Sequence, residues 1–295
     1  MSKSTPVEKI LFVINPVSGP GEKDWNNIIN SFFQGQPQQI ELYTMPEQAT
    51  VALIKGKIIS CTPCMVVAVG GDGTIKLVAE SLLDTKIPLG ILPAGSANGM
   101  AKELAIPMDP EAALQVLITG SMQTIHLTEV NGHICIHLSD IGYNANLIRH
   151  FEQQSGRGMF GYLRAAFKAL FRHPVMEVTM EVGPKRMDLR AAMVVLANGT
   201  EYGSGARINP IGKLNDTLFE VVVVKKISAA EIFKMRFSHT SFNPAKTAVY
   251  QTSRVQIRSV KPVHFQVDGE YIGKVKTIDA WLLPAALQVM VPALL

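Results

Sequence analysis

Short apolar runs alternate with stretches of helical spacing through the first 125 residues. Residues 10–14 form an apolar run, and the apolar side chains that follow recur every three or four positions: Trp25, Ile28, Ile29, Phe32 and Phe33. This spacing predicts one face of a helix. The same alternation predicts strands at 39–43, 65–69 and 89–92 and helices at 49–58 and 75–83. Strands and helices in this order predict a parallel sheet with helices on both faces, in a Rossmann-like α/β domain.

After about residue 125 the strand-like stretches follow one another closely. They lie at 124–130, 133–139, 175–182, 191–197, 218–224, 254–259 and 263–267. Closely spaced strands separated by turn residues are typical of an antiparallel sandwich or barrel. One helical stretch interrupts them at 160–171, and it either covers the core of the sheet or faces a lipid surface. We therefore expect an α/β domain over residues 1–125 and a β-rich sandwich or barrel domain over residues 126–276.

The composition excludes several classes of protein. Of the 295 residues, 47% are hydrophobic and 18% are charged, and the mean hydropathy is +0.18. Such a chain can bury a large core, which excludes a disordered, coiled-coil or collagenous protein. Three cysteines are too few for a disulfide scaffold. The net charge of +4 does not by itself argue for nucleic acid as a partner, and it does not oppose a membrane surface with anionic lipid.

The apolar runs are too short for an export signal or a membrane span. Residues 10–14 are shorter than the apolar region of a secretory signal, and a spanning helix needs about 20 apolar residues. The longest uncharged run, 280–295, contains Pro284 and Pro292, and we interpret it as buried strands. These features predict a cytoplasmic protein.

The clearest chemical signal is Gly70-Gly71-Asp72-Gly73-Thr74, between a predicted buried strand and a predicted helix. Glycines let the backbone turn sharply and approach a ligand closely. The free N–H groups at the start of a helix favour an anion such as phosphate. We expect Asp72 to cap that helix or to orient a cation, and Thr74 to offer a hydroxyl. The alternative is an ordinary strand-to-helix turn.

Two more loops follow predicted strands on the same side of the sheet. They lie at 15–19 and 93–98, and both contain Gly, Ser and Asn. Ligands of open α/β sheets bind outside the carboxyl ends of the strands. The three loops together therefore predict a nucleotide-phosphate site, although each loop alone is equally an ordinary turn.

The chain resembles the diacylglycerol kinase catalytic family, which includes bacterial lipid kinases, sphingosine kinases and ceramide kinases. The resemblance covers almost the whole chain and implies that the C-terminal strands, residues 277–295, return to complete the first domain. NAD kinases are similar at Gly-Gly-Asp-Gly-Thr alone, so the combination with a late Asp-Gly-Glu is what distinguishes this family. The segments that carry the resemblance are Asn15-Pro16-x-Ser18-Gly19, Gly70-Gly71-Asp72-Gly73-Thr74, residues 88–98, Val267-Asp268-Gly269-Glu270 and residues 283–292.

The resemblance implies a lipid kinase, which transfers the γ-phosphoryl group of ATP to a hydroxyl of a lipid such as diacylglycerol, as in phospholipid biosynthesis. It makes Asp268 the general base, with Glu270 close by. A carboxylate suits this role because a lipid hydroxyl is a poor nucleophile until its proton is removed. Without the family, the pair Asp268-Gly269 favours a hairpin turn over a catalytic role. The residues implied to bind ATP are Asn15, Thr44, Gly70, Gly71, Asp72, Gly73, Thr74 and Ser96.

The resemblance also implies a structural Mg²⁺ ion in the second domain. Its ligands would be the Asp216 carboxylate and the backbone carbonyls of Lys213 and Leu218. Oxygen donors of this kind suit a hard cation. Family members of the bacterial type have Asp-Gly here, whereas this chain has Asp216-Thr217.

Other departures from the family pattern leave two alternatives open. Lys76-Leu77 replaces an Asn-Glu pair that often follows Gly-Gly-Asp-Gly-Thr, and Asn144 replaces an Asp, which loses a charge. One alternative is an NAD kinase-like phosphotransferase with a soluble acceptor. The other is a catalytically silent protein that binds lipid or nucleotide.

The partners follow from the same resemblance. We expect ATP with Mg²⁺, a lipid substrate at a membrane surface and no nucleic acid. Peripheral association with the inner face of the membrane is expected. The oligomeric state stays open, with a homodimer among the options.

Overall fold

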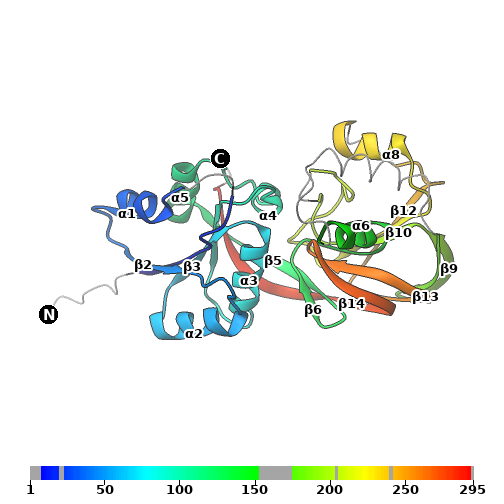
Figure 1. Ribbon diagram of the computed structural model, residues 1–295, viewed down its shortest axis with the longest axis horizontal. Helices are drawn as coiled ribbons and strands as arrows, with labels where there is room; N and C mark the ends of the chain where they lie inside the picture. The colour runs from blue at the N-terminus through cyan, green and yellow to red at the C-terminus, as the bar shows by residue number, and fades with distance from the viewer. Residues whose placement is uncertain (1–7, 20–22, 153–174, 203–204, 239–241, 294–295) are drawn as a thin grey trace. The chain divides into compact units, whose positions relative to one another are not determined.

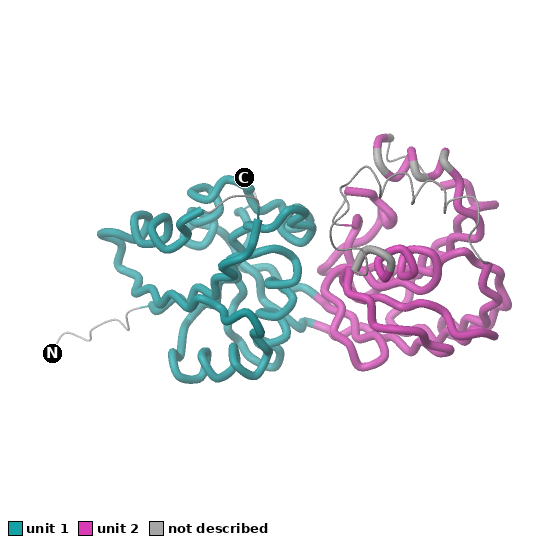
Figure 2. The backbone as a smooth tube through the Cα atoms, in the orientation of Figure 1, with its two compact units in different colours: residues 1–125, 285–295 teal, residues 126–284 magenta. Residues whose placement is uncertain are grey.

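The computed structural model describes residues 8–19, 23–152, 175–202, 205–238 and 242–293. The helix predicted at 160–171 lies outside these residues. The chain forms two compact units: unit 1 is Met1–Ile125 with Ala285–Leu295, and unit 2 is His126–Pro284. Figures 1 and 2 show the two units. None of the helices in the described ranges combines the length and the hydropathy that crossing a membrane requires.

Unit 1 is built on a parallel sheet in the order β2-β1-β3-β4. Every residue of β3 is buried, which agrees with its unbroken apolar sequence because helices cover both of its faces. The predicted Rossmann-like α/β architecture is confirmed. Its strands are β1 (Lys9–Ile14), β2 (Gln39–Thr44), β3 (Met65–Gly70) and β4 (Leu89–Pro93).

The helices of unit 1 form two pairs, α1 with α5 and α2 with α3, on opposite faces of the sheet (Figure 1). On α1 the buried residues are Trp25, Ile29 and Phe33, which belong to the predicted apolar face. The Phe33 ring meets Phe12 of β1 edge to face, with ring centroids 5.7 Å apart. The helices are α1 (Trp25–Phe33), α2 (Val51–Cys61), α3 (Asp72–Leu82), α4 (Gly99–Glu103) and α5 (Pro110–Thr119).

Unit 2 is dominated by antiparallel strands, as expected, with short helices beside them (Figure 1). Its strands are β6 (His133–Cys135), β7 (Leu138–Gly142), β8 (Met176–Val182), β9 (Lys185–Ala191), β10 (Met193–Ala197), β11 (Phe219–Val224), β12 (Thr247–Thr252) and β13 (Arg254–Val267). Strands β5 (Ser121–Val130) and β14 (Glu270–Val291) belong partly to each unit. The helices in the described part of this unit are α6 (Tyr143–Glu152), α8 (Ala229–Phe233) and the π-helix η1 (Lys234–Ser238).

Strand β13 belongs to two layers of unit 2. Its residues 255–259 pair with β8, and its residues 265–267 pair with β7. The register against β14 shifts between Arg258 and Val263, and such a bulge bends a strand. The sequence predicts two strands here, and the structure joins them into one. Buried side chains from both layers, among them Val178, Phe219, Ile257 and Phe265, form one core, which confirms the predicted β-rich sandwich.

Strand β14 starts in unit 2 and ends in unit 1. Its first half pairs with β13, and near its end Val289 lies beside Leu89 of β4 in a parallel pair. Ala285 has a positive φ of 50° at the point where the chain passes between the units. The expected return of the C-terminal residues to the first sheet is confirmed.

Candidate functional site

The four parallel strands of unit 1 end along a single edge of the sheet. Ile14 lies beside both Thr44 and Val69, and Gly70 lies beside Pro93. This register brings the three predicted loops and Thr44 to the same edge. The carboxyl edge of an open α/β sheet is where such folds bind their ligands.

Asn15 and Thr74 connect the first two of these loops. The Asn15 backbone N–H donates to Val69 O at 3.0 Å, and its side-chain amide donates to the Thr74 hydroxyl at 3.0 Å. Thr74 is only 4% exposed. Its hydroxyl therefore orients the Asn15 side chain, which in turn accepts from the Val17 N–H and shapes its own loop.

Asp72 caps a different helix from the one expected. Its two carboxylate oxygens accept from the N–H groups of Gly99 and Met100, each at 3.0 Å. These are the first N–H groups of α4, so Asp72 ties the Gly-rich loop to the 93–98 loop. Helix α3 itself starts after Gly71 without a side-chain cap, and its first N–H groups are therefore available to an anion.

The glycines of these loops have two different environments. A Cβ atom on Gly95 would come within 2.5 Å of Gly71 Cα, so both glycines are needed for the two loops to touch. A Cβ atom on Gly73 would meet nothing within 4 Å, and Gly73 is exposed. The surface above the start of α3 is thus open at Gly73, which suits the close approach of a phosphate group.

A hollow of about 220 Å³ lies at this edge, between the first and third loops. Sequence reasoning missed three of its residues, Lys23, Trp25 and Met108. The Lys23 ammonium lies 5.6 Å from the centre of the Trp25 ring, so a positive charge is held beside the loops by a cation–π contact. The signal in the sequence was a Lys two residues after Gly21 and two residues before the start of α1. Ser96 is exposed on the loop beside this hollow.

In unit 2, Asp268 lies in the two-residue hairpin turn that joins β13 to β14. Its φ is +51°, and its carboxylate accepts hydrogen bonds from the backbone of the β6–β7 connection. The Oδ2 atom accepts from Ile136 N–H at 3.0 Å, and the Oδ1 atom accepts from His137 and Leu138 N–H at 2.9 and 3.2 Å. These bonds interrupt the strand predicted at 133–139, because the backbone N–H groups there bind Asp268 instead of a neighbouring strand.

A thiol also contacts the Asp268 carboxylate. The Cys135 Sγ atom lies 3.5 Å from Oδ1, and burial raises the pKa of this thiol well above its usual value. The thiol therefore stays protonated and donates. Hydrogen bonds from N–H and S–H groups stabilise a negative charge on the carboxylate and fix its orientation. Glu270, the first residue of β14, is exposed beyond the turn.

A second carboxylate, which sequence reasoning did not identify, lies buried in the same unit. Asp140 is 1% exposed, and burial raises its pKa to about 6. Its Oδ2 atom accepts from Asn144, Tyr202 and Gln266, and its Oδ1 atom accepts from Ala145 N–H at 2.9 Å. The substitution of Asn144 for an Asp thus does not leave this place uncharged, because Asp140 supplies a carboxylate 2.7 Å from the Asn144 amide.

Gln266 connects the two carboxylates. Its amide nitrogen donates to Asp140 at 2.6 Å, and its amide oxygen accepts from Gly269 N–H at 2.8 Å. Gly269 directly follows Asp268 in the hairpin turn. The buried Asp140 therefore helps to hold the turn that carries Asp268. Nothing in the local sequence could show this, since Asp140 and Gln266 lie 126 residues apart.

A cavity of about 420 Å³ lies at the far end of β7. Strand β7 runs from Leu138, which contacts Asp268, to Gly142, which lines the cavity. Five residues of strand span about 13 Å. Apolar side chains such as Met176 and Val263 line the cavity together with Lys261 and Lys274, a combination that fits an amphiphilic ligand.

The segment 213–218 offers oxygen atoms of the kind that Mg²⁺ prefers. The described residues contain no group of three His, Cys, Asp or Glu side chains that could hold a metal, so any ion here needs backbone carbonyls as well. The Asp216 carboxylate lies close enough to Glu220 to help burial raise the Glu220 pKa. Among the described residues, the buried Asn209 amide oxygen has no hydrogen-bond partner, while its nitrogen donates to Glu220. Asp216 and Glu220 thus place two carboxylates near each other, and carboxylate oxygens suit a hard cation.

Two family models match this chain. The Diacylglycerol kinase catalytic domain matches residues 9–130, and the YegS C-terminal NAD kinase beta sandwich-like domain matches residues 139–291. The matched regions contain the loops at the edge of the first sheet and the Asp268 hairpin, respectively.

Several curated proteins are similar in sequence. The Diacylglycerol kinase of Bacillus subtilis is 27% identical over 71% of this chain and 72% of its own length. The Probable lipid kinase YegS-like of Klebsiella pneumoniae is 28% identical over 77% of each chain. An uncharacterized Synechocystis protein is 25% identical over 77% of this chain, which spans about half, 54%, of that relative.

The fold is also found in a solved structure. The crystal structure of a putative diacylglycerol kinase from Bacillus anthracis superimposes with a TM-score of 0.78. The match covers 99% of this chain and 98% of the other, at 20% sequence identity. This likeness shows that the two chains share one fold.

Proposed function

Because the chain belongs to the family that joins a diacylglycerol kinase catalytic domain to a YegS C-terminal NAD kinase beta sandwich-like domain, we propose that it transfers the γ-phosphoryl group of ATP to a hydroxyl of a lipid such as diacylglycerol. The main support for the proposal is the set of groups at the carboxyl edge of the unit 1 sheet. There the uncapped start of α3, the open surface at Gly73 and the Lys23 ammonium together offer an anion site.

In this proposal the loops of unit 1 bind the nucleotide. The N–H groups at the start of α3 receive phosphate oxygens, while Asn15, Thr44, Gly70, Gly71 and Ser96 line the same edge. Thr74 and Asp72 act indirectly. Thr74 orients the Asn15 side chain, and Asp72 fixes the neighbouring 93–98 loop. Mg²⁺ accompanying the nucleotide would neutralise part of the phosphate charge.

Asp268 is the proposed general base. The acceptor oxygen forms a bond to the γ-phosphorus as the bond from that phosphorus to the β,γ-bridging oxygen of ATP breaks, and ADP leaves. The hydroxyl proton passes to the Asp268 carboxylate, whose orientation is fixed by the backbone of residues 136–138. Phosphoryl transfer depends mainly on positioning and electrostatics, so a carboxylate held by hydrogen bonds suits this step.

The cavity at the far end of β7 supports a lipid as the acceptor. Its apolar side chains would hold acyl chain, and its lysines would meet polar or anionic groups of the lipid. The oxygens of Lys213, Asp216 and Leu218 are the proposed ligands of a structural Mg²⁺ ion, which would stabilise the loop before β11.

The proposal is tested by offering γ-labelled ATP with Mg²⁺ and lipids in mixed micelles, with the wild type and the Asp268→Asn variant. The lipids are diacylglycerol, phosphatidylglycerol, sphingoid bases and a total lipid extract. We expect label in a lipid with the wild type and a rate lower by about 10²- to 10⁴-fold in the variant. ATP binding, measured by calorimetry, stays within about twofold.

Asp188→Asn is the matched control, because Asp188 is an exposed carboxylate on β9 of the same unit. A loss below tenfold in Asp268→Asn removes Asp268 as the base. Label in a water-soluble hydroxyl compound and in no lipid would favour the NAD kinase-like alternative. ATP binding without transfer to any acceptor would favour a silent binding protein.

A further inference from the structure

The positive charge of the chain is concentrated in one segment of unit 2. Residues 225–246 contain five Lys or Arg and one Glu, whereas the rest of the chain contains 23 basic and 23 acidic residues. The whole net charge of +4 therefore resides in these 22 residues. The segment includes α8 and η1, and we call its described residues, 225–238 and 242–246, the basic segment.

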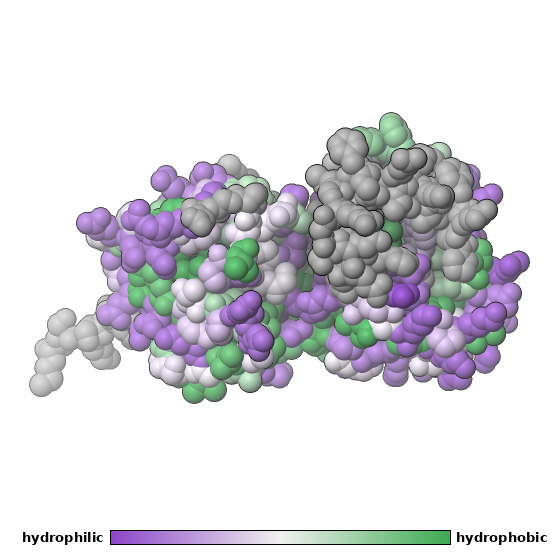
Figure 3. Space-filling view, in the orientation of Figure 1, coloured by the Kyte–Doolittle hydropathy of each residue, from purple (hydrophilic) through white to green (hydrophobic). Residues whose placement is uncertain are grey.

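The same segment exposes two large aromatic rings. Phe233 is 58% exposed and Phe237 is 65% exposed, and their ring centroids lie 5.0 Å apart. Figure 3 shows the hydrophobic surface that α8 contributes at the top of unit 2. In contrast, Met235 between them in the sequence packs against the core that includes Leu138 and Val195. The rings are thus the outer face of a helix that is anchored by its inner face.

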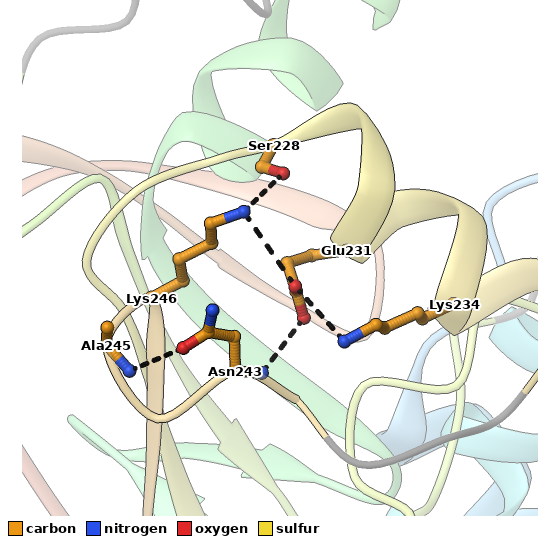
Figure 4. Close-up of polar contacts among 6 residues, drawn as sticks. All are labelled: Ser228, Glu231, Lys234, Asn243, Ala245 and Lys246. Carbon is orange, nitrogen blue, oxygen red and sulfur yellow. Dashed lines mark hydrogen bonds and ion pairs between the residues drawn. The ribbon is translucent and has the colours of Figure 1, made fainter.

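A buried carboxylate fixes the helix in this position. Glu231 is 6% exposed, and it lies 3.4 Å from the Lys234 ammonium and 4.0 Å from the Lys246 ammonium (Figure 4). It also accepts from Asn243 N–H at 3.2 Å, and Lys246 donates to the Ser228 hydroxyl. The Glu231 carboxylate and its two ammonium partners therefore keep the helix in place.

We propose that the basic segment docks on the surface of a bilayer that contains anionic phospholipid. Phe233 and Phe237 enter the interface between headgroups and acyl chains, and Lys225 and the exposed Lys226 lie at the level of the lipid phosphates. Aromatic rings beside basic residues are the combination that holds a helix in the plane of a membrane. Anionic lipid attracts clustered basic side chains, and salt screens this attraction. The inference does not depend on which reaction the protein catalyses.

The test measures sedimentation of the full chain with vesicles, without ATP. Phosphatidylcholine vesicles are compared with vesicles containing phosphatidylglycerol at about three parts in ten. We expect binding to the anionic vesicles that weakens on the order of tenfold in the double variant Phe233→Ser, Phe237→Ser. Lys225→Glu with Lys226→Glu should weaken it by a similar factor and reduce its dependence on salt.

Matched controls distinguish binding through the basic segment from non-specific adsorption to vesicles. Ile59→Ser removes a 75% exposed side chain from α2 of unit 1, and Lys185→Glu with Arg186→Glu reverses exposed charges on β9. Neither should change vesicle binding. Thermal midpoints check that every variant is folded.

Three results would overturn the proposal. They are no binding of the wild type to anionic vesicles, equal loss in the control variants, and unchanged binding in the phenylalanine variant. If the phenylalanine variant changes only the oligomeric state, the rings form a contact between protein chains instead. All of these results are independent of the kinase assay, because that assay measures phosphoryl transfer.

Discussion

Asp140 shows how one buried side chain can influence a distant turn. Its carboxylate accepts four hydrogen bonds, and one of its donors, Gln266, also accepts from the turn that contains Asp268. The titratable group in contact with it is the buried Tyr202, whose pKa is raised well above its usual value. Burial of Asp140 makes its ionised form costly, and the four donors recover only part of that cost.

The raised pKa of Asp140 predicts how stability depends on pH. The pKa is 3.8 in an unfolded chain and about 6 in the folded one, so the folded state holds more protons between these values. The contribution of Asp140 to the free energy of unfolding therefore falls as pH rises from about 4 to about 6, by on the order of 3 kcal/mol. Asp140→Asn removes this contribution. Urea unfolding at several pH values should show a flatter profile for the variant, and parallel profiles would contradict the assignment.

Substitution by alanine should affect different properties at two glycines of unit 1: ATP affinity at Gly73 and stability at Gly95. In Gly73→Ala the added methyl enters open space at the start of α3, so stability should change by less than about 1 kcal/mol. The methyl occupies the place proposed for phosphate, and ATP affinity should fall about tenfold or more. In Gly95→Ala the methyl meets the Gly71 backbone, which should cost about 1–3 kcal/mol of stability. Calorimetry for ATP and urea unfolding separate the two effects.

The sequence identified several residues of the candidate site, but it did not always identify the residues that they contact. The Gly-rich loop and the late Asp-Gly turn are visible as motifs. The sequence identifies Asp72 as a possible helix cap. The helix that it caps, however, starts at Gly99, which lies 27 residues after Asp72. Lys23 and Asp140 belong to no motif, and only the folded chain reveals their neighbours. Contacts between residues far apart in the sequence are the part that local patterns do not contain.

Helix α4 depends on a cap from outside itself. It has five residues, its N-cap Asn98 makes no capping hydrogen bond of its own, and Asp72 provides the acceptors for its first N–H groups. A helix this short is not stable on its own. The Asn98 side chain instead bonds to Gly95 and closes the preceding loop.

Removal of the cap should therefore loosen the third loop. In Asp72→Ala we expect a loss of about 1–2 kcal/mol of stability and faster amide hydrogen exchange at Gly99 and Met100. Asp24→Ala is the matched control, because Asp24 caps α1 at an exposed position through Asn27 N–H. It should leave exchange at α4 unchanged. Unchanged exchange at Gly99 and Met100 in Asp72→Ala would refute the role of Asp72 as a cap.

Among the elements, those with strong hydrophobic periodicity were predictable. The strands of unit 1 and helix α1 follow the apolar pattern closely. Helix α5 was missed although its signals are present, with Asp109 as N-cap, Pro110 at its first position and Gly120 after its end. The break between β6 and β7 was not predictable, because the hydrogen bonds that cause it come from Asp268.

At the scale of the whole molecule, β14 contributes to both cores. Leu287, Val289 and Val291 are buried near its end, and Val289 lies beside Leu89 of β4. The buried strands predicted within 280–295 are thus replaced by the end of one longer strand, which runs from Glu270 to Val291. The return to the first domain was expected only through the family resemblance, since hydrophobic pattern alone does not say which sheet a strand joins.

Charge at Val289 should disrupt unit 1. Val289→Asp places a carboxylate where the side chain is 0% exposed, and we expect a loss of more than about 3 kcal/mol of stability together with loss of ATP binding. Gln288→Asp is the matched control, because Gln288 is the exposed neighbour on the same strand. It should unfold at nearly the same urea concentration as the wild type. Equal unfolding midpoints for the two variants would contradict the placement of β14.

The course of β14 also determines the order in which the protein can fold during synthesis. The last strand beside β4 is synthesised long after β4 itself, because Val289 follows its partner Leu89 by 200 residues in the chain. Until then the edge of β4 presents unpaired N–H and C=O groups, which other chains can pair with. The nascent protein therefore carries an aggregation-prone edge from the synthesis of β4 until the synthesis of residues 285–291, and we infer that a chaperone acting in this interval would favour its yield.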